Sequence, residues 1–169
     1  MAMWRELIQS YTQNGVLTGP ASDSEIEWVE GTLEAKMPAS LRALLRESDG
    51  LAVRLSLPGE GDEVKSVVWS TDEMISQNLE LRVNDPIHGK DKTYPYLFFA
   101  SETNGDPMAF VVENGQAKDA PIVVLSHDNR WEKRTRDTDL RGYIEAFLKF
   151  AVARSGVGHH NGDRTKEKA

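Results

Sequence analysis

Apolar residues recur three or four positions apart in four parts of the chain, which is the spacing of amphipathic helices. The first part is Met3–Tyr11 and the last begins near Thr138. Between them, Ser24–Gly50 holds two helix-length segments that meet at Pro38, and a further helix starts at Ser70. Proline cannot continue the first helix of this pair, but its fixed φ suits the first turn of the second. The pattern therefore predicts five helices.

Local chemistry indicates where these helices begin and which side chains they bury. Ser70 and Glu73 form the pattern in which a hydroxyl and a carboxylate satisfy the free amides of a helix start. The second helix can start with either of two such pairs: Ser24 with Glu27, or Ser22 with Glu25. Trp28 lies off the apolar line of that helix. The predicted inner faces are Met3, Trp4, Leu7, Ile8 and Tyr11; Ile26, Val29 and Leu33; Leu41, Leu44 and Leu45; Met74, Ile75, Asn78 and Leu79; and Leu140, Tyr143, Ile144, Phe147, Leu148 and Ala151.

After the central helices, Leu51–Leu55 alternates between apolar and polar residues, as half-buried strands do, and Leu97–Ala100 is a short apolar run. Asn104-Gly105 and Asn114-Gly115 are hairpin turn signals. Pro121 opens a β-rich segment, at a start position where proline costs no ladder hydrogen bond. The predicted strands are Leu51–Leu55, Val64–Trp69, Leu97–Ala100, Met108–Val112, Pro121–Leu125 and an edge strand, Arg130–Arg136.

With 169 residues, the chain is most economically one domain. The order of helices, strands, helix, strands and helix predicts an α+β fold in which an antiparallel β-sheet is flanked by helices. We expect an N-terminal helix and connector over residues 1–20 and a folded domain over 21–154. We expect a disordered tail over 155–169, which has no apolar periodicity. The segments 58–62 and 84–94 are predicted to be a turn and an exposed loop.

The formal net charge is −7, and because the tail from Ser155 carries +1, the body carries −8. Such a surface repels phosphate backbones and attracts basic proteins, so we expect no nucleic acid partner. Arg5 and Glu6 stand where a signal peptide needs an apolar core, and no apolar run approaches the length of a membrane span. We therefore expect a soluble, cytoplasmic protein with no membrane partner. The chain has no cysteine, which excludes disulfides and thiolate sites.

The candidates for hydrolytic or metal chemistry are Asp106, His127 and Asp128, because an imidazole near two carboxylates can hold a cation or position a water. Both aspartates fall in predicted turns, where aspartate is favoured by its bonds to nearby backbone, and we prefer that interpretation. No recognisable phosphate loop, nucleophile elbow or zinc motif occurs in the sequence. We therefore assign no catalytic residues, no metal ligands and no cofactor.

Two charged stretches are candidate binding surfaces. A local charge of +3 beside Trp131, within Arg130–Arg136, fits single-stranded nucleic acid or an edge strand protected by charge, and we prefer the edge strand. The acidic stretch from Pro58 to Asp91 carries −5. If its carboxylates cluster in space, they form a landing surface for a basic protein. The residues that we expect at this partner surface are Glu60, Asp62, Glu63, Trp69, Asp72, Glu73, Asp85, Asp91 and Tyr94.

Three segments resemble the SMI1/KNR4 superfamily, also called SUKH, in their order and spacing. They are Met37-Pro38-Ala39-Ser40-Leu41 through Asp49-Gly50, Val68-Trp69-Ser70-Thr71, and Leu97-Phe98-Phe99-Ala100 with Asn104-Gly105-Asp106. The resemblance spans Ser24–Ala151. The chain departs from the family pattern at Glu34, where the family often has glycine, at Met37, which replaces leucine, and at Asp49, which replaces asparagine.

The resemblance implies a protein-binding module rather than an enzyme, with the SMI1/KNR4-like domain over 21–154. In bacteria, proteins of this type act mainly as immunity proteins that neutralise toxins of polymorphic or contact-dependent systems, often nucleases. The expected partner is therefore a cognate toxin with a basic surface. A regulatory scaffold, as the fungal relatives suggest, is the alternative, and a metal-dependent hydrolase built on Asp106, His127 and Asp128 is the third hypothesis.

Overall fold

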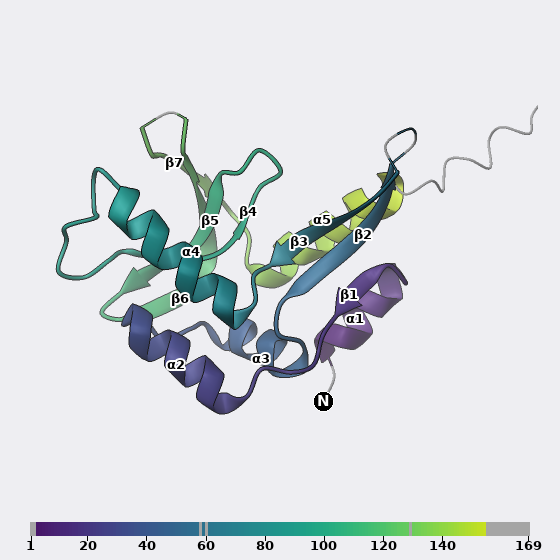
Figure 1. Ribbon diagram of the computed structural model, residues 1–169, viewed down its shortest axis with the longest axis horizontal. Helices are drawn as coiled ribbons and strands as arrows, with labels where there is room; N and C mark the ends of the chain where they lie inside the picture. Colours follow the sequence, from purple (N-terminus) through teal and green to yellow (C-terminus); the bar gives the residue numbers. More distant parts are fainter. Residues whose placement is uncertain (1–2, 58, 60, 129, 155–169) are drawn as a thin grey trace, which may run out of the picture.

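The computed structural model describes residues 3–57, 59, 61–128 and 130–154 (Figure 1). The predicted tail at 155–169 and two positions of the predicted 58–62 turn, Pro58 and Glu60, lie outside these residues. The helices are α1 (Met3–Tyr11), α2 (Asp23–Leu33), α3 (Ala39–Glu47), α4 (Thr71–Asn84) and α5 (Leu140–Arg154). The strands are β1 (Gly15–Leu17), β2 (Leu51–Leu57), β3 (Gly61–Val68), β4 (Tyr96–Ser101), β5 (Pro107–Glu113), β6 (Gln116–Ser126) and β7 (Glu132–Arg136).

The α+β class and the antiparallel pairing are confirmed, and the strands divide into two sheets. One has the order β1-β2-β3 and the other β4-β5-β6-β7. A backbone hydrogen bond of 2.8 Å, from Trp69 N–H to the carbonyl of Phe99, joins the end of the first sheet to the second. The predicted edge strand is present as β7, which lies at the border of its sheet.

Strand β1 was not predicted, because the sequence after Tyr11 indicates only a connector. Its three residues pair with β2 in the register Gly15 to Val53 and Leu17 to Leu51. Three residues are too few to display a two-residue period, so only tertiary pairing identifies them as a strand. The preceding helix α1 buries Trp4 and Ile8, and its first amides donate to the Glu47 carboxylate at 2.9 Å.

Two residues that depart from the family pattern, Glu34 and Asp49, stand at the ends of α2 and α3. The Ser22 hydroxyl accepts the Glu25 N–H, so the earlier of the two predicted starts is correct. Glu34 ends α2 with φ 54°, a left-handed conformation that glycine adopts without strain. Asp49, after α3, accepts bonds from the Thr71 backbone (2.7 Å) and hydroxyl (3.1 Å) at the start of α4. The proline at position 38 caps α3, as its fixed φ favours.

Helix α4 begins with the predicted box of Ser70 and Glu73, but its inner face differs from the prediction at one residue. Met74 and Asn78 are fully buried, whereas Leu79 is 44% exposed. The Asn78 amide takes the inward position because it donates to the carbonyl of Phe98 at 2.8 Å and accepts the Phe98 N–H at 2.9 Å. This pair of bonds fixes α4 against β4.

The second sheet follows the predicted hairpins with one correction. Asn114 and Gly115 both have positive φ, 52° and 74°, and form the turn between β5 and β6. Pro121 was predicted to start a strand, but β6 already starts at Gln116 and Pro121 lies inside it. The pairing with β5 is irregular there, since β6 carries additional residues between Ala117 and Ile122. A proline is tolerated at such an irregularity because the ladder requires no N–H from it.

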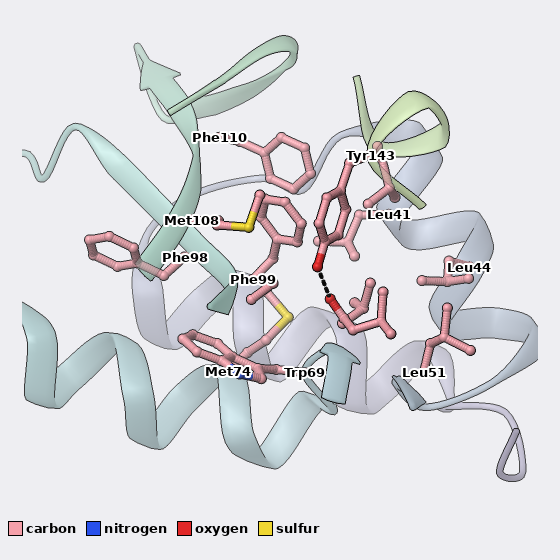
Figure 2. Close-up of a cluster of buried hydrophobic side chains, with 14 of the residues drawn as sticks. Leu41, Leu44, Leu51, Trp69, Met74, Phe98, Phe99, Met108, Phe110 and Tyr143 are labelled. Carbon is pink, nitrogen blue, oxygen red and sulfur yellow. Dashed lines mark hydrogen bonds between the residues drawn. The ribbon is translucent and has the colours of Figure 1, made fainter. Parts of the chain in front are cut away.

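The core lies where α3, α4 and α5 meet the two sheets (Figure 2). Phe99 and Phe110 stack with ring centroids 4.4 Å apart, and Tyr143 of α5 contacts Phe99 edge-on. The Tyr143 hydroxyl donates to the carbonyl of Val67 at 2.8 Å, which satisfies the one polar atom that this ring brings inside. Burial raises the pKa of this hydroxyl above its ordinary value.

Candidate functional site

The residues predicted for the partner surface separate into distant regions. Asp62 and Glu63 lie on β3, in the hairpin at the upper right of Figure 1, while Asp72 and Glu73 lie in the first turn of α4, beyond the opposite end of β3. Glu60 lies outside the described residues. The hairpin acids have partners there, because Asp62 accepts the Ser56 hydroxyl at 2.7 Å and Glu63 pairs with Lys65 at 3.1 Å. The structure does not bring the predicted acids together on one face.

Trp69 is 7% exposed, so the expectation that it is exposed to a partner is wrong. It follows β3 directly, and its bond to the second sheet draws it into the core beside Met74 (Figure 2). Trp69 lies between a strand and a helix in the sequence, and neither pattern indicates whether its side chain is buried or exposed. Only the packing of the two sheets decides it.

Asp85 and Tyr94 organise the loop that follows α4. Asp85 is buried, and its carboxylate accepts the amides of Ile87 (2.8 Å) and His88 (3.0 Å) and the Tyr94 hydroxyl (2.7 Å). Burial and this bond raise the pKa of Tyr94. The loop is exposed elsewhere, as at Asp91, which pairs with His88 at 2.8 Å. Asp85 therefore holds the loop together from a buried position, which corrects the prediction that the loop is exposed and that Asp85 is available to a partner.

The strongest concentration of negative charge lies on α2 and α4, which pack side by side. Together these helices contain seven carboxylates and one guanidinium, a formal charge of −6 out of the −7 of the whole chain. The guanidinium, Arg82, is turned away from solvent: it donates to the carbonyl of Leu33 and covers the Tyr94 ring at 4.8 Å. Desolvation lowers its pKa. The carboxylates are Asp23, Glu25, Glu27, Glu30, Asp72, Glu73 and Glu80.

Two of these seven carboxylates are neutralised by α3. Asp23 pairs with Arg46 at 2.9 Å, and the buried Glu30 pairs with Arg42 and accepts the Met37 N–H. In the described part of the chain, no ion pair involves any of the other five. We call the group of Glu25, Glu27, Asp72, Glu73 and Glu80 on α2 and α4 the acidic helix face. Glu25 and Asp72 line one hollow between the two helices, whereas Glu27 lies on the α3 side of α2. The sequence-based prediction named Asp72 and Glu73 and counted Glu80 in the acidic stretch, but it missed Glu25 and Glu27, since nothing in the sequence says that α2 lies beside α4.

The three residues considered for hydrolysis do meet in space. His127 Nδ1 lies 2.5 Å from the buried Asp106 carboxylate, and its Nε2 lies 3.1 Å from Asp128. Arg134 of β7 contacts Asp106 at 3.2 Å and Glu102 at 3.0 Å, and Arg136 also pairs with Glu102. We call Glu102, Asp106, His127, Arg134 and Arg136 the paired charge cluster.

Each ionised group of the paired charge cluster has an opposite charge or a hydrogen bond donor beside it. Burial alone would raise the pKa of Asp106, but bonds from the His127 backbone and ring and from Asn104 outweigh it and hold the pKa below its ordinary value. The hydrogen bond to Glu102 raises the pKa of Arg134. Within the described residues, no three histidine, aspartate or glutamate side chains are arranged to hold a metal ion. The arrangement fits an edge strand tied to the neighbouring turns.

A cavity of about 450 Å³ opens between this cluster and α5. Its polar wall is Glu102, Arg134 and Arg136, and its apolar wall includes Phe147 and Phe150. The polar wall is internally paired, so its charges already have partners. Two of the cations of the basic stretch near Trp131, Arg134 and Arg136, are therefore engaged with acids of their own chain, and Trp131 packs against Phe98.

Comparison with known proteins places these features in context. The sequence model of the SMI1 / KNR4 family (SUKH-1) matches residues 20–146, which run from the segment before α2 into α5 and include the paired charge cluster. No curated protein matches the sequence. None of the described helices is long and apolar enough to cross a membrane.

Proposed function

Because the chain belongs to the SMI1/KNR4 (SUKH-1) family, we propose that it is an immunity protein, which binds one cognate protein toxin and neutralises it without making or breaking bonds. The observation that carries the proposal is the acidic helix face: five carboxylates on two adjacent helices, with no ion pair to them within the described residues. Acids that have no cation beside them are available to a basic protein, although Glu73 also accepts the Ser70 N–H in the capping box.

A nuclease toxin is the partner that this face fits best. The active cleft of a nuclease must attract phosphate, and it therefore carries positive potential. An acidic protein is steered to such a cleft and competes there with the nucleic acid. Steering raises the association rate, which matters to a cell that must neutralise a toxin before it acts.

The proposal predicts that a toxin domain is encoded beside the gene for this chain, and this domain is the partner used in its test. Cells that express the active domain should die alone and grow when this protein is co-expressed. The purified protein and a catalytically inactive toxin variant should form a 1:1 complex by size-exclusion chromatography with light scattering. The proposal is wrong if the two proteins do not associate and growth is not restored. A stable complex with a signalling or housekeeping protein in place of the toxin would favour the scaffold alternative, which the same acidic face also suits.

A further inference from the structure

Large apolar side chains stand exposed on the acidic helix face, beside its carboxylates. Among the described residues seven large hydrophobic side chains are exposed, and four of them belong to α2, α4 and the turn after α4. They are Trp28 (68%), Leu79 (44%), Val83 (83%) and Ile87 (58%). Single exposed hydrophobic residues are ordinary on protein surfaces, but a group on one side of the molecule indicates a binding surface.

Three of these residues, Trp28, Leu79 and Val83, form a line together with Ile75. Trp28 and Ile75 line one shallow hollow of about 160 Å³ with Glu25 and Asp72, so the indole lies against the outer side of α4. From Ile75, the residues Leu79 and Val83 follow at four-residue intervals along α4. With a rise of about 1.5 Å per residue, this line runs on the order of 12 Å from the tryptophan hollow to Val83.

The fold itself does not require these side chains. The inner face of α2 is filled by Ile26, Val29 and Leu33, all buried, and that of α4 by Met74 and Asn78. Trp28 lies outside the line that packs the core. Its exposure leaves a large apolar surface in water, which lowers solubility and adds little to the free energy of folding.

We propose that this line, with Trp28 as its anchor, is the docking surface for the protein's partner, and that the partner presents an apolar pocket bordered by lysine or arginine. The proposal rests on the proposed immunity function and names the surface that performs it. An apolar centre with a charged rim is the usual anatomy of a specific interface, and tryptophan is among the residues that most often dominate binding energy. Here Glu25, Asp72 and Glu80 supply the rim.

Charge complementarity selects a basic protein over other occupants. A second copy in a two-fold dimer would place the same patch against itself, so two groups of unpaired carboxylates would face one another. A membrane with anionic lipids and a nucleic acid both carry negative charge and would be repelled. A basic rim on the partner gives every unpaired acid of the face an opposite charge.

The test measures binding of the toxin domain that the proposed function predicts beside the gene, inactivated in its catalytic site, and it uses variants of similar chemistry at exposed positions. Trp28→Ala is compared with Phe150→Ala on α5, Val83→Ala with Val64→Ala on β3, and Glu80→Lys with Glu63→Lys. All six positions are exposed in the structure, and urea unfolding of each variant checks that the fold is kept. Isothermal titration calorimetry gives the Kd of each.

We expect Trp28→Ala to raise Kd by about 30-fold or more, as at an interface hot spot, and the three control variants to stay within about twofold of the wild type. Val83→Ala and Glu80→Lys should weaken binding by smaller factors, each more than its control. If Trp28→Ala binds as tightly as wild type while Phe150→Ala or Glu63→Lys binds weakly, the docking surface is wrong and the immunity function stands. If the wild type itself does not bind, the immunity function falls and this surface falls with it. A dimer of the free protein that dissociates on Trp28→Ala, seen by analytical ultracentrifugation, would overturn the choice of partner.

Discussion

The acidic helix face and the paired charge cluster use the same residue types in opposite ways. The cluster joins Glu102 and Asp106 to arginines of β7 and to His127, so each carboxylate has a partner within the chain. On α2 and α4 five carboxylates have no ion pair in the described residues. The difference teaches that the number of charges does not locate a binding surface, whereas the lack of internal partners does. Paired charges tie structure together, and unpaired charges repel one another until a partner arrives.

Part of the charge on the acidic helix face also stabilises its own helices. Glu25 of α2 and Asp72 and Glu73 of α4 lie in first turns, where negative charge interacts favourably with the helix dipole. Glu27 and Glu80 lie beyond the first turn and gain no such stabilisation. Glu80 is therefore the sharpest probe of the face, because a change in it should alter encounter with a partner and leave folding almost untouched. Glu27 is a poorer probe, since it lines a hollow with Lys36, Arg42 and Arg46 and a lysine there would meet like charges.

The largest difference should appear when one carboxylate is removed from each region. Asp106→Ala should lower the free energy of unfolding by about 2 kcal/mol, because a buried carboxylate that accepts several charge-assisted hydrogen bonds is lost and its donors remain unpaired. Glu80→Ala should change it by no more than about 0.5 kcal/mol, as for exposed residues in general. Urea denaturation followed by circular dichroism measures both. Equal costs for the two variants would abolish the distinction between the regions.

The second difference concerns the rate of encounter with the toxin domain. The double variant Glu25→Lys and Glu80→Lys should lower the association rate constant about tenfold at low salt, because it reverses the charge that steers a basic partner. The matched variant Asp62→Lys and Glu63→Lys, on the β2–β3 hairpin, should have a much smaller effect. Stopped-flow measurements of the association rate constant at low and high ionic strength check this. The difference in rate constant between the two double variants should become smaller as salt screens the charges. A rate lowered equally by both double variants would mean that only net charge matters.

Most helices were predictable from the sequence because their apolar spacing is long enough to be unambiguous. The cap at Ser70 and the buried face of α5 needed no knowledge of neighbours. Strand β1 and the position of Pro121 within β6 were not predictable in this way, because each depends on pairing with a strand elsewhere in the chain. Asn78 was correctly placed on the inner face of α4, where its amide bonds to β4. Leu79 was wrongly placed there, because an apolar residue is expected to be buried.

The candidate surface was less predictable than the fold for a physical reason. Counting charge along a sequence window joined Asp62, near the start of β3, to Asp72, which lies beyond the opposite end of that strand, and omitted Glu25, which lines a hollow with Asp72 of α4. The exposure of Trp28 could be suspected from its position off the apolar line of α2, whereas the burial of Trp69 could not. A charge surface belongs to the tertiary arrangement, so it becomes visible only when the helices are placed side by side.

A smaller effect should appear in the dependence of stability on pH. The pKa of Asp106 is lower in the folded protein than its ordinary value, so its ionised form favours the folded state. This contribution is complete above the unfolded-state value near pH 4, and it is lost as the pH falls through the lower folded-state value. The free energy of unfolding of wild type should therefore fall toward that of Asp106→Asn as the pH drops below about 4. A difference between the two proteins that stays constant from pH 6 to pH 2 would show that the ionised carboxylate contributes nothing.

The smallest effect should come from removing a single arginine of the paired charge cluster. Arg136 is about half exposed and pairs with Glu102, which keeps a second partner in Arg134 at 3.0 Å. Arg136→Ala should therefore change the free energy of unfolding by no more than about 0.5 kcal/mol, as exposed ion pairs do. Removing both arginines should cost more than the two single changes added together, because Glu102, with only 15% of its side chain exposed, then has neither cation beside it. Additive single and double variants in urea denaturation would show that the arginines act separately, and the cluster would then be a group of independent surface pairs.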